Sequence, residues 1–104
     1  MTEVVRRIEA QSEEDLRLSD LAADAGMSPY RLLRCFHRVV GMTPHQYVLR
    51  TRLQLAAVRI ATTRLPVSTV AFEVGFNDLS TFNARFRRVM GISPLAYRAA
   101  KSRH

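Results

Sequence analysis

Two stretches of this sequence place arginine, serine, threonine and tyrosine on one side of an amphipathic helix. In residues 28–40, apolar side chains recur at i, i+3, i+4 and i+7, the spacing of one helix face: Leu32, Cys35, Phe36 and Val39. The opposite side carries Tyr30, Arg34, His37 and Arg38, with Arg31 and Leu33 on its flanks. In residues 78–90 the apolar stripe is Leu79, Phe82, Phe86 and Val89, and the outward side carries Ser80, Thr81, Ala84, Arg87 and Arg88.

Such outward faces suit close approach to nucleic acid, because guanidinium and hydroxyl groups hydrogen bond to base edges and phosphates. A solvated helix can carry the same residue types. The occurrence of the pattern twice in one chain favours the nucleic-acid interpretation over the solvated one.

The charge distribution also points to a polyanionic partner. The chain has 104 residues, a net charge of +7, and 16 basic side chains, of which 15 are arginine. Residues 1–50 hold seven basic and seven acidic side chains, whereas residues 51–104 hold nine and two. A basic surface attracts nucleic acid or anionic lipid, and arginine favours phosphate and guanine. With 47% hydrophobic residues, the chain is predicted to form one packed domain over residues 1–104.

Other chemistry has little support in the sequence. Cys35 lies in an apolar stripe, which is typical of a buried structural thiol. His37, His45 and His104 have no cysteine or carboxylate at ligand spacing, so no metal site is predicted. No base–nucleophile pair or glycine-rich phosphate loop is present, so we predict neither an enzyme nor a cofactor. Because the N-terminus lacks a signal-peptide core and no apolar run reaches ~20 residues, a cytoplasmic protein is expected.

Glycine, proline and capping residues divide the chain into seven short helices with no strand. In the first part of the chain we expect four helices: at about 3–11, from Ser19 to Ala25, from Ser28-Pro29 to Gly41, and from Thr43-Pro44 to about Thr63. In the second part we expect three: from Ser68 to Gly75, from Asn77 or Asp78 to Gly91, and a final helix that starts at Ser93-Pro94. Ser19 and Ser68 are predicted N-caps. Met27, Tyr47 and Phe76 are predicted to belong to the core.

An internal repeat relates the two halves. The segment FHRVVGMTP at 36–44 returns as FRRVMGISP at 86–94, an offset of fifty. The segment LSDLA at 18–22 returns as VSTVA at 67–71, an offset of forty-nine. Each copy reads as a short helix, a glycine turn and a longer helix, which is the unit that places its second helix in a major groove. The sequence therefore predicts helix-turn-helix units at about 18–41 and 67–91. The alternative is a helical hairpin repeated only for packing.

A long helix at about 43–63 joins the two units. Its ~19 residues at ~1.5 Å rise would make a rod of about 28 Å. Major grooves on one face of B-DNA recur about every 34 Å. The length is therefore consistent with recognition helices at about 28–40 and 78–90 in adjacent major grooves.

The second half carries a longer motif. The run VAFEVGFNDLSTF at 70–82, followed by Phe86-Arg87-Arg88, Gly91, Ser93-Pro94 and Tyr97-Arg98, resembles the signature of the AraC/XylS family of bacterial transcription regulators. The resemblance covers about residues 4–98. It implies an all-α domain of seven helices, in which two helix-turn-helix units joined by a long helix bind double-stranded DNA.

The resemblance also implies which residues face the bases. These are Tyr30, Leu33 and Arg34 in the first unit, and Leu79, Ser80, Thr81 and Ala84 in the second. Two positions depart from the family pattern: members often carry arginine where this chain has Ala84, and a polar residue where it has Leu33. Arg85 follows Ala84 but lies about 100° further round the helix.

Phosphate contacts can be predicted from helix ends and charge. Thr43 and Ser93 start helices, whose N-termini present free N–H groups and a positive dipole end. Plain N-capping explains both residues equally well. The same phosphate contacts are predicted for six further residues of the two outward faces: Arg31, His37, Arg38, Arg85, Arg87 and Arg88.

Sequence-specific DNA binding for transcription, including activation, is the function that these patterns favour. The alternatives are a module that modulates another regulator through protein contacts, with a weak DNA face, and an accessory domain of a DNA-repair enzyme. RNA polymerase is a candidate partner, and an effector-binding or dimerisation domain is expected if the chain is a fragment.

Overall fold

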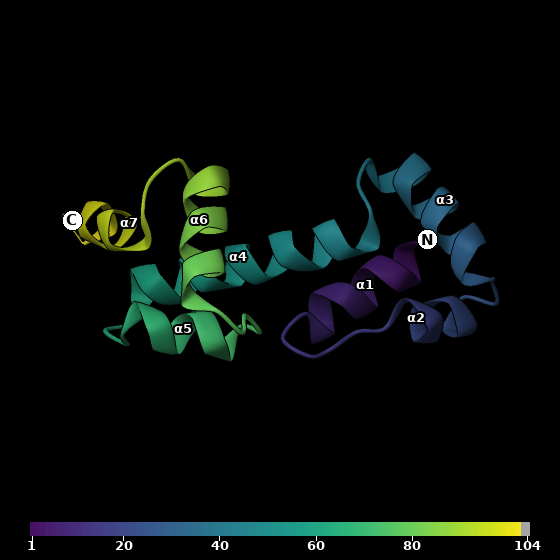
Figure 1. The fold of residues 1–104 in the computed structure, drawn as a ribbon, viewed down its shortest axis with the longest axis horizontal. Helices are drawn as coiled ribbons and strands as arrows, with labels where there is room; N and C mark the ends of the chain where they lie inside the picture. The colour runs from purple at the N-terminus through teal and green to yellow at the C-terminus, as the bar shows by residue number, and fades with distance from the viewer. Residues whose placement is uncertain (103–104) are drawn as a thin grey trace. The chain divides into compact units, whose positions relative to one another are not determined.

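The computed structural model describes residues 1–102, so His104 lies outside the described residues. Within them the chain forms seven α-helices and no strand, as the sequence predicted (Figure 1). The helices are α1 (Thr2–Gln11), α2 (Leu18–Asp24), α3 (Pro29–Val40), α4 (Pro44–Thr62), α5 (Val67–Glu73), α6 (Leu79–Met90) and α7 (Pro94–Lys101). None of the helices in this part of the chain has the length and apolarity needed to cross a membrane.

The chain folds as two compact units. The first unit is Met1–Thr51 and holds α1, α2, α3 and the start of α4. The second unit begins at Arg52 and holds the rest of α4 with α5, α6 and α7. The boundary falls inside α4, so this one helix contributes to both cores.

The core of the first unit is built by four helices. Its buried members are Val4, Ile8, Leu21, Ala22, Leu32, Phe36 and Val48. Phe36 is fully buried, and its ring meets the edge of Tyr47 with centroids 5.8 Å apart. The Tyr47 hydroxyl donates to Glu9 Oε1 at 2.6 Å, which ties α4 to α1. This hydrogen bond raises the pKa of Tyr47, because the bond is lost when the phenol ionises.

The core of the second unit is built from the C-terminal part of α4 together with α5, α6 and α7. Buried residues on α4 follow the helical spacing of i, i+3, i+4 and i+7: Leu53, Ala56, Ala57 and Ile60. Further buried apolar side chains come from α5, α6 and the turn between them, and Pro94 at the start of α7 is buried as well: Val70, Ala71, Val74, Phe76, Phe82, Phe86 and Pro94. Phe86 meets the edge of Tyr97 at 5.5 Å, the counterpart of the Phe36–Tyr47 pair.

Glycines end the two longer helices in the left-handed region. Gly41 has φ 86° at the end of α3, and Gly91 has φ 87° at the end of α6. A Cβ at either position would meet nothing within 4 Å. The requirement for glycine is therefore conformational, because side chains disfavour positive φ, and not a matter of space.

The structure corrects four of the expectations. Ser19 and Ser68 do not cap: α2 follows Arg17 and α5 follows Pro66, and neither helix has a side-chain cap. Val39 and Val89, predicted to close the apolar stripes, are 67% and 52% exposed. The neighbouring Val40 and Met90 are half-buried instead.

The two valines were misplaced because burial follows the i, i+4, i+8 row of each helix. Leu32, Phe36 and Val40 make up that row in α3, and Val40 packs against the core. Such a row is inclined to the helix axis. In the last turn the core therefore contacts the side of the helix that carries position 40 or 90, and position 39 or 89 stays exposed to solvent. Three more residues were expected in the core. Phe76 is buried, as predicted, whereas Met27 and Tyr47 are half-buried and pack against the core.

Candidate nucleic-acid interface

Local capping sets the start of α3 and therefore the direction in which its side chains point. The Ser28 hydroxyl accepts from the Arg31 backbone N–H at 3.2 Å, and Pro29 occupies the first helical position. This cap satisfies one of the N–H groups that a helix leaves unpaired at its start.

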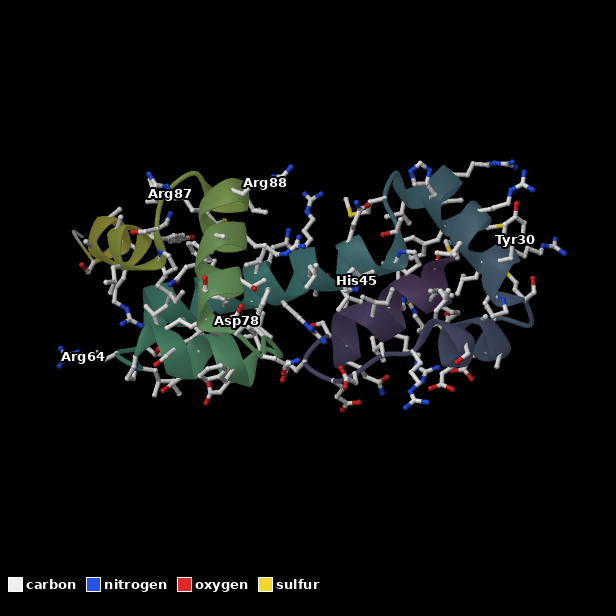
Figure 2. All side chains as sticks on the ribbon, viewed as in Figure 1. Tyr30, His45, Arg64, Asp78, Arg87 and Arg88 are labelled. Carbon is white, nitrogen blue, oxygen red and sulfur yellow. The ribbon has the colours of Figure 1, made fainter. Side chains whose placement is uncertain are left out.

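The outward face of α3 is exposed. Tyr30 is 69% and Leu33 37% exposed, and the sequence-predicted charged residues of this face are also exposed: Arg31, Arg34, His37 and Arg38. The Arg34 guanidinium lies over the Tyr30 ring, 5.8 Å from its centroid, which is a cation–π contact (Tyr30 is labelled in Figure 2).

Two shallow hollows bring the α3 residues together. One of about 450 Å³ is lined by Leu33, Arg34, His37, Arg38 and Thr43. A neighbouring hollow of about 340 Å³ is lined by Tyr30, Arg31, Arg34, Cys35 and Arg38. Arg34 and Arg38 line both, so one continuous surface joins residues predicted to contact bases with residues predicted to contact phosphates. Cys35 is half-buried at the edge of this surface.

Thr43 begins α4 with a reciprocal cap. Its hydroxyl accepts from the Gln46 N–H at 3.1 Å, and Gln46 Oε1 accepts from the Thr43 N–H at 3.0 Å. Ser93 begins α7 in the same way by accepting from the Ala96 N–H at 3.1 Å. Both hydroxyls therefore act as N-caps.

The outward face of α6 begins with an acidic cap. Asp78 accepts from the Ser80 and Thr81 backbone N–H groups at 3.1 Å and 3.2 Å. These bonds and one from the Thr81 hydroxyl hold the pKa of Asp78 below its usual value, and the hydroxyl contributes most. Ser80, Thr81 and Ala84 are exposed, whereas Leu79 is half-buried.

A groove of about 650 Å³ runs along α6 from its first residue, Leu79, to Arg87. Four α6 residues line it, namely Leu79, Asn83, Ala84 and Arg87. Its other walls are Pro66 and Val67 at the start of α5, and Ser93, Pro94, Leu95 and Arg98 at α7. Ala84 and Arg87 therefore share a surface with Ser93, although Ser93 comes nine positions after Ala84 in the sequence.

Arg85, Arg87 and Arg88 project from α6 as exposed cations. No side-chain hydrogen bond or ion pair ties these guanidinium groups to any of residues 1–102. Asp78 lies at one end of α6, and Arg87 and Arg88 lie near the other (Figure 2). The helix therefore carries its positive charge toward its C-terminal end.

Comparison with known proteins places this geometry in a family. A family model described as a helix-turn-helix domain, of the AraC/XylS type, matches residues 21–100. The chain belongs to the AraC/XylS family. The family and the named relatives are transcription regulators.

Among relatives of this AraC/XylS domain, the transcriptional activator AarP of Providencia stuartii is 35% identical over 94% of this chain and 73% of its own length. The regulatory protein SoxS of Escherichia coli is 31% identical over 92% of this chain and 90% of its own. The chain spans only 36% of the probable regulator LumQ of Photobacterium leiognathi, with 39% identity. The chain likewise spans about a third of the length of several other relatives.

Solved structures of AraC-type domains share the fold. An AraC-type regulator from Chromobacterium violaceum is 30% identical, with a TM-score of 0.91 over 98% of this chain and 91% of its own. The DNA-binding domain of AdpA, solved in complex with a target DNA, is 34% identical, with a TM-score of 0.86 over 95% and 89%.

Sequence reasoning missed that some arginines of the AraC/XylS domain belong to its scaffold. Arg98 donates from Nε to the Ile60 carbonyl at 3.0 Å and from its terminal nitrogen to the Leu65 carbonyl. Arg52 donates to the Gly75 carbonyl at 3.1 Å, across the turn of the second unit. These contacts satisfy carbonyls at helix ends and turns, which leaves fewer arginines for a ligand than the net charge suggests. The only sequence signal was the position of Arg98 in the motif.

Proposed function

We propose that this domain binds double-stranded DNA at specific sequences to regulate transcription, with α3 and α6 inserted in adjacent major grooves. The observation that carries the proposal is the repetition of one arrangement. In each unit a capped helix, ended by a left-handed glycine, presents an exposed face of polar and cationic side chains above a buried phenylalanine. A helix presented in this way fits the major groove.

Within this function, we assign the residues of the outward faces and of the following helix starts to two groups. The first group reads base edges and consists of Tyr30, Leu33, Arg34, Leu79, Ser80, Thr81 and Ala84. Arg31, His37, Arg38, Thr43, Arg85, Arg87, Arg88 and Ser93 contact phosphates. The free arginines on α6 support the second assignment, because a guanidinium with no intramolecular partner can neutralise phosphate without breaking a bond in the fold.

In the cell, we infer a cytoplasmic activator that engages RNA polymerase at its target promoters. The relative AarP is named a transcriptional activator, and this supports activation over repression. In longer relatives the remaining length has room for a further domain, and an effector-binding or dimerisation domain is the expected companion of this one.

The experiment that tests the function is selection of bound sequences from a random duplex pool, followed by anisotropy titration of the selected site. If about six phosphates are neutralised, log K should fall with log[salt] at a slope of roughly −5. A slope near −1, with no enriched sequence, would contradict the proposal and favour a protein-interaction module.

Substitution of Arg88 separates phosphate contact from base reading. Arg88→Ala should weaken binding to all sequences by a similar factor and reduce the salt slope by about 1. Arg64→Ala is the matched control, because Arg64 is an exposed arginine of the same unit on the connection before α5, away from Arg87 and Arg88 (Figure 2). A changed sequence preference in Arg88→Ala would move this residue to the base-reading group.

A further inference from the structure

The first turn of α6 contains a side-chain contact that capping alone does not require. Asp78 Oδ1 accepts from the Ser80 N–H, and Oδ2 accepts from the Thr81 N–H at 3.2 Å. Oδ2 also accepts from the Thr81 hydroxyl at 2.5 Å. The two backbone bonds cap the helix, whereas the third bond orients a side chain on the outward face.

The direction of this third bond follows from the chemistry of its partners. An ionised carboxylate has no proton and can only accept. Asp78 is ionised at neutral pH, since its pKa lies below the ordinary value of 3.8. A threonine hydroxyl has one proton and two lone pairs. Since the proton is directed to Asp78, the Thr81 oxygen has only lone pairs to offer to a ligand.

Base edges in the major groove differ in whether they can satisfy such an oxygen. Adenine and cytosine present an amino group there, whereas guanine and thymine present acceptors at the corresponding positions. Building on the proposed DNA-binding function, we propose that Asp78 is a positioning residue that makes Thr81 an acceptor-only reader, so that Thr81 selects adenine or cytosine over guanine or thymine at one base of the site.

The first unit shows that the cap does not need this device. Ser28 is the counterpart of Asp78 at the offset of fifty, and it caps α3 through a single bond to the Arg31 N–H. Arg31 is the counterpart of Thr81 and has no hydroxyl to orient. Ser80 in α6 has no bond through its own hydroxyl to any of residues 1–102, so its hydroxyl remains free to donate or accept.

The test uses the cap of the first unit as a substitution in the second. Asp78→Ser retains a residue that caps well but removes the acceptor-only carboxylate, so the Thr81 hydroxyl regains its freedom to donate. The wild type should prefer adenine or cytosine at the Thr81 position by about tenfold, the usual weight of one hydrogen bond to a base. In Asp78→Ser this preference should fall below about threefold, with the preferences at other positions unchanged.

Two further variants separate positioning from general damage. Thr81→Val keeps the shape of the side chain and removes its oxygen, so it should lose the same preference, and the double variant should lose no more than Thr81→Val alone. Ser28→Ala is the matched control, because it removes the equivalent cap without an oriented hydroxyl. It should leave the preference at the Thr81 position intact.

A modified duplex tests the atoms directly. When adenine at that position is replaced by purine, which lacks the exocyclic amino group, wild-type binding should fall about tenfold and Thr81→Val binding should not change. In DNA-free protein, Thr81→Val should raise the pKa of Asp78 toward its usual value, as read by carboxyl NMR.

The outcomes distinguish this inference from the function on which it rests. A wild-type preference that survives Asp78→Ser would overturn the inference and leave the proposed function standing, whether or not Thr81→Val removes that preference. The absence of any sequence preference in the wild type would overturn both. An unchanged Asp78 pKa in Thr81→Val would show that the hydroxyl bond is missing, whatever the DNA result.

Discussion

The two units of this domain share a scaffold and differ on the surface that the scaffold presents. Phe36 and Phe86 are both fully buried. Phe36 makes an edge contact with Tyr47, and Phe86 makes the same contact with Tyr97, fifty residues further along the chain. Gly41 and Gly91 end their helices with nearly the same φ. Repetition at these positions shows that packing and helix termination constrain both copies alike.

The outward faces have diverged at matched positions. Arg34, stacked over Tyr30, corresponds to Ala84, and His37 corresponds to Arg87. Arg34 lines both hollows beside α3, of about 450 Å³ and 340 Å³, whereas Ala84 lines the groove of about 650 Å³ beside α6. The first unit therefore presents a large cationic side chain at the position where the second presents a methyl group beside small polar residues.

The largest expected effect tests the shared scaffold. Phe36→Ala and Phe86→Ala should each destabilise the domain by about 3–5 kcal/mol, because each removes a fully buried ring. Thermal melting of each variant measures the cost. Val39→Ala and Val89→Ala are the controls from the same helices, and their exposed side chains should leave the midpoint nearly unchanged. A large cost at only one phenylalanine would show that the two cores are not equivalent.

The next effect tests the divergence of the faces. We expect the first unit to discriminate bases more strongly, because the Arg34 fork can pair with guanine O6 and N7 for about 1–3 kcal/mol. Ala84 offers only a methyl group. A base-by-base scan of the selected site should show two blocks about 10 base pairs apart with unequal penalties.

Arg34→Ala should flatten the stronger block and leave the weaker one in place. Arg85→Ala is the companion variant, because Arg85 is the arginine next to the Ala84 position on α6. Blocks of equal strength, or a strong block that persists in Arg34→Ala, would contradict this asymmetry and indicate reading by Arg85 or by DNA shape.

The smallest effect concerns the caps and their dependence on pH. The pKa of Asp78 is lowered in the folded protein from an ordinary value of 3.8. Its stabilisation is therefore fully present above about pH 3.8 and is lost as the pH falls through the lower folded pKa. The drop in melting midpoint caused by Asp78→Ala should shrink in that acid range. The drop caused by Ser28→Ala should not change there, since a serine hydroxyl does not titrate. Parallel behaviour of the two variants would show that the charge on Asp78 adds nothing to its cap.

The sequence predicted most of the secondary structure because helix ends depend on local bonds. Ser28, Thr43, Asp78 and Ser93 cap the helices that were expected to follow them. The exceptions, Ser19 and Ser68, lie inside helices that begin without a side-chain cap. The helix α2 follows Arg17 and is held by the buried Leu21, and α5 follows Pro66 and is held by the buried Val70. Tertiary packing of these side chains therefore sets where each helix begins, without a side-chain cap.

What the sequence determined by itself was therefore the repeat, the helices, the family and the residues of the outward faces, since all of these are carried by residue type and spacing along the chain. Tertiary structure alone decided three further matters: that Val40 and not Val39 packs against the core, that Arg98 and Arg52 bind carbonyls of the scaffold, and that Ala84 and Ser93 share one groove. Each depends on where a neighbouring helix lies in space, and periodicity within one helix contains no information about its neighbour.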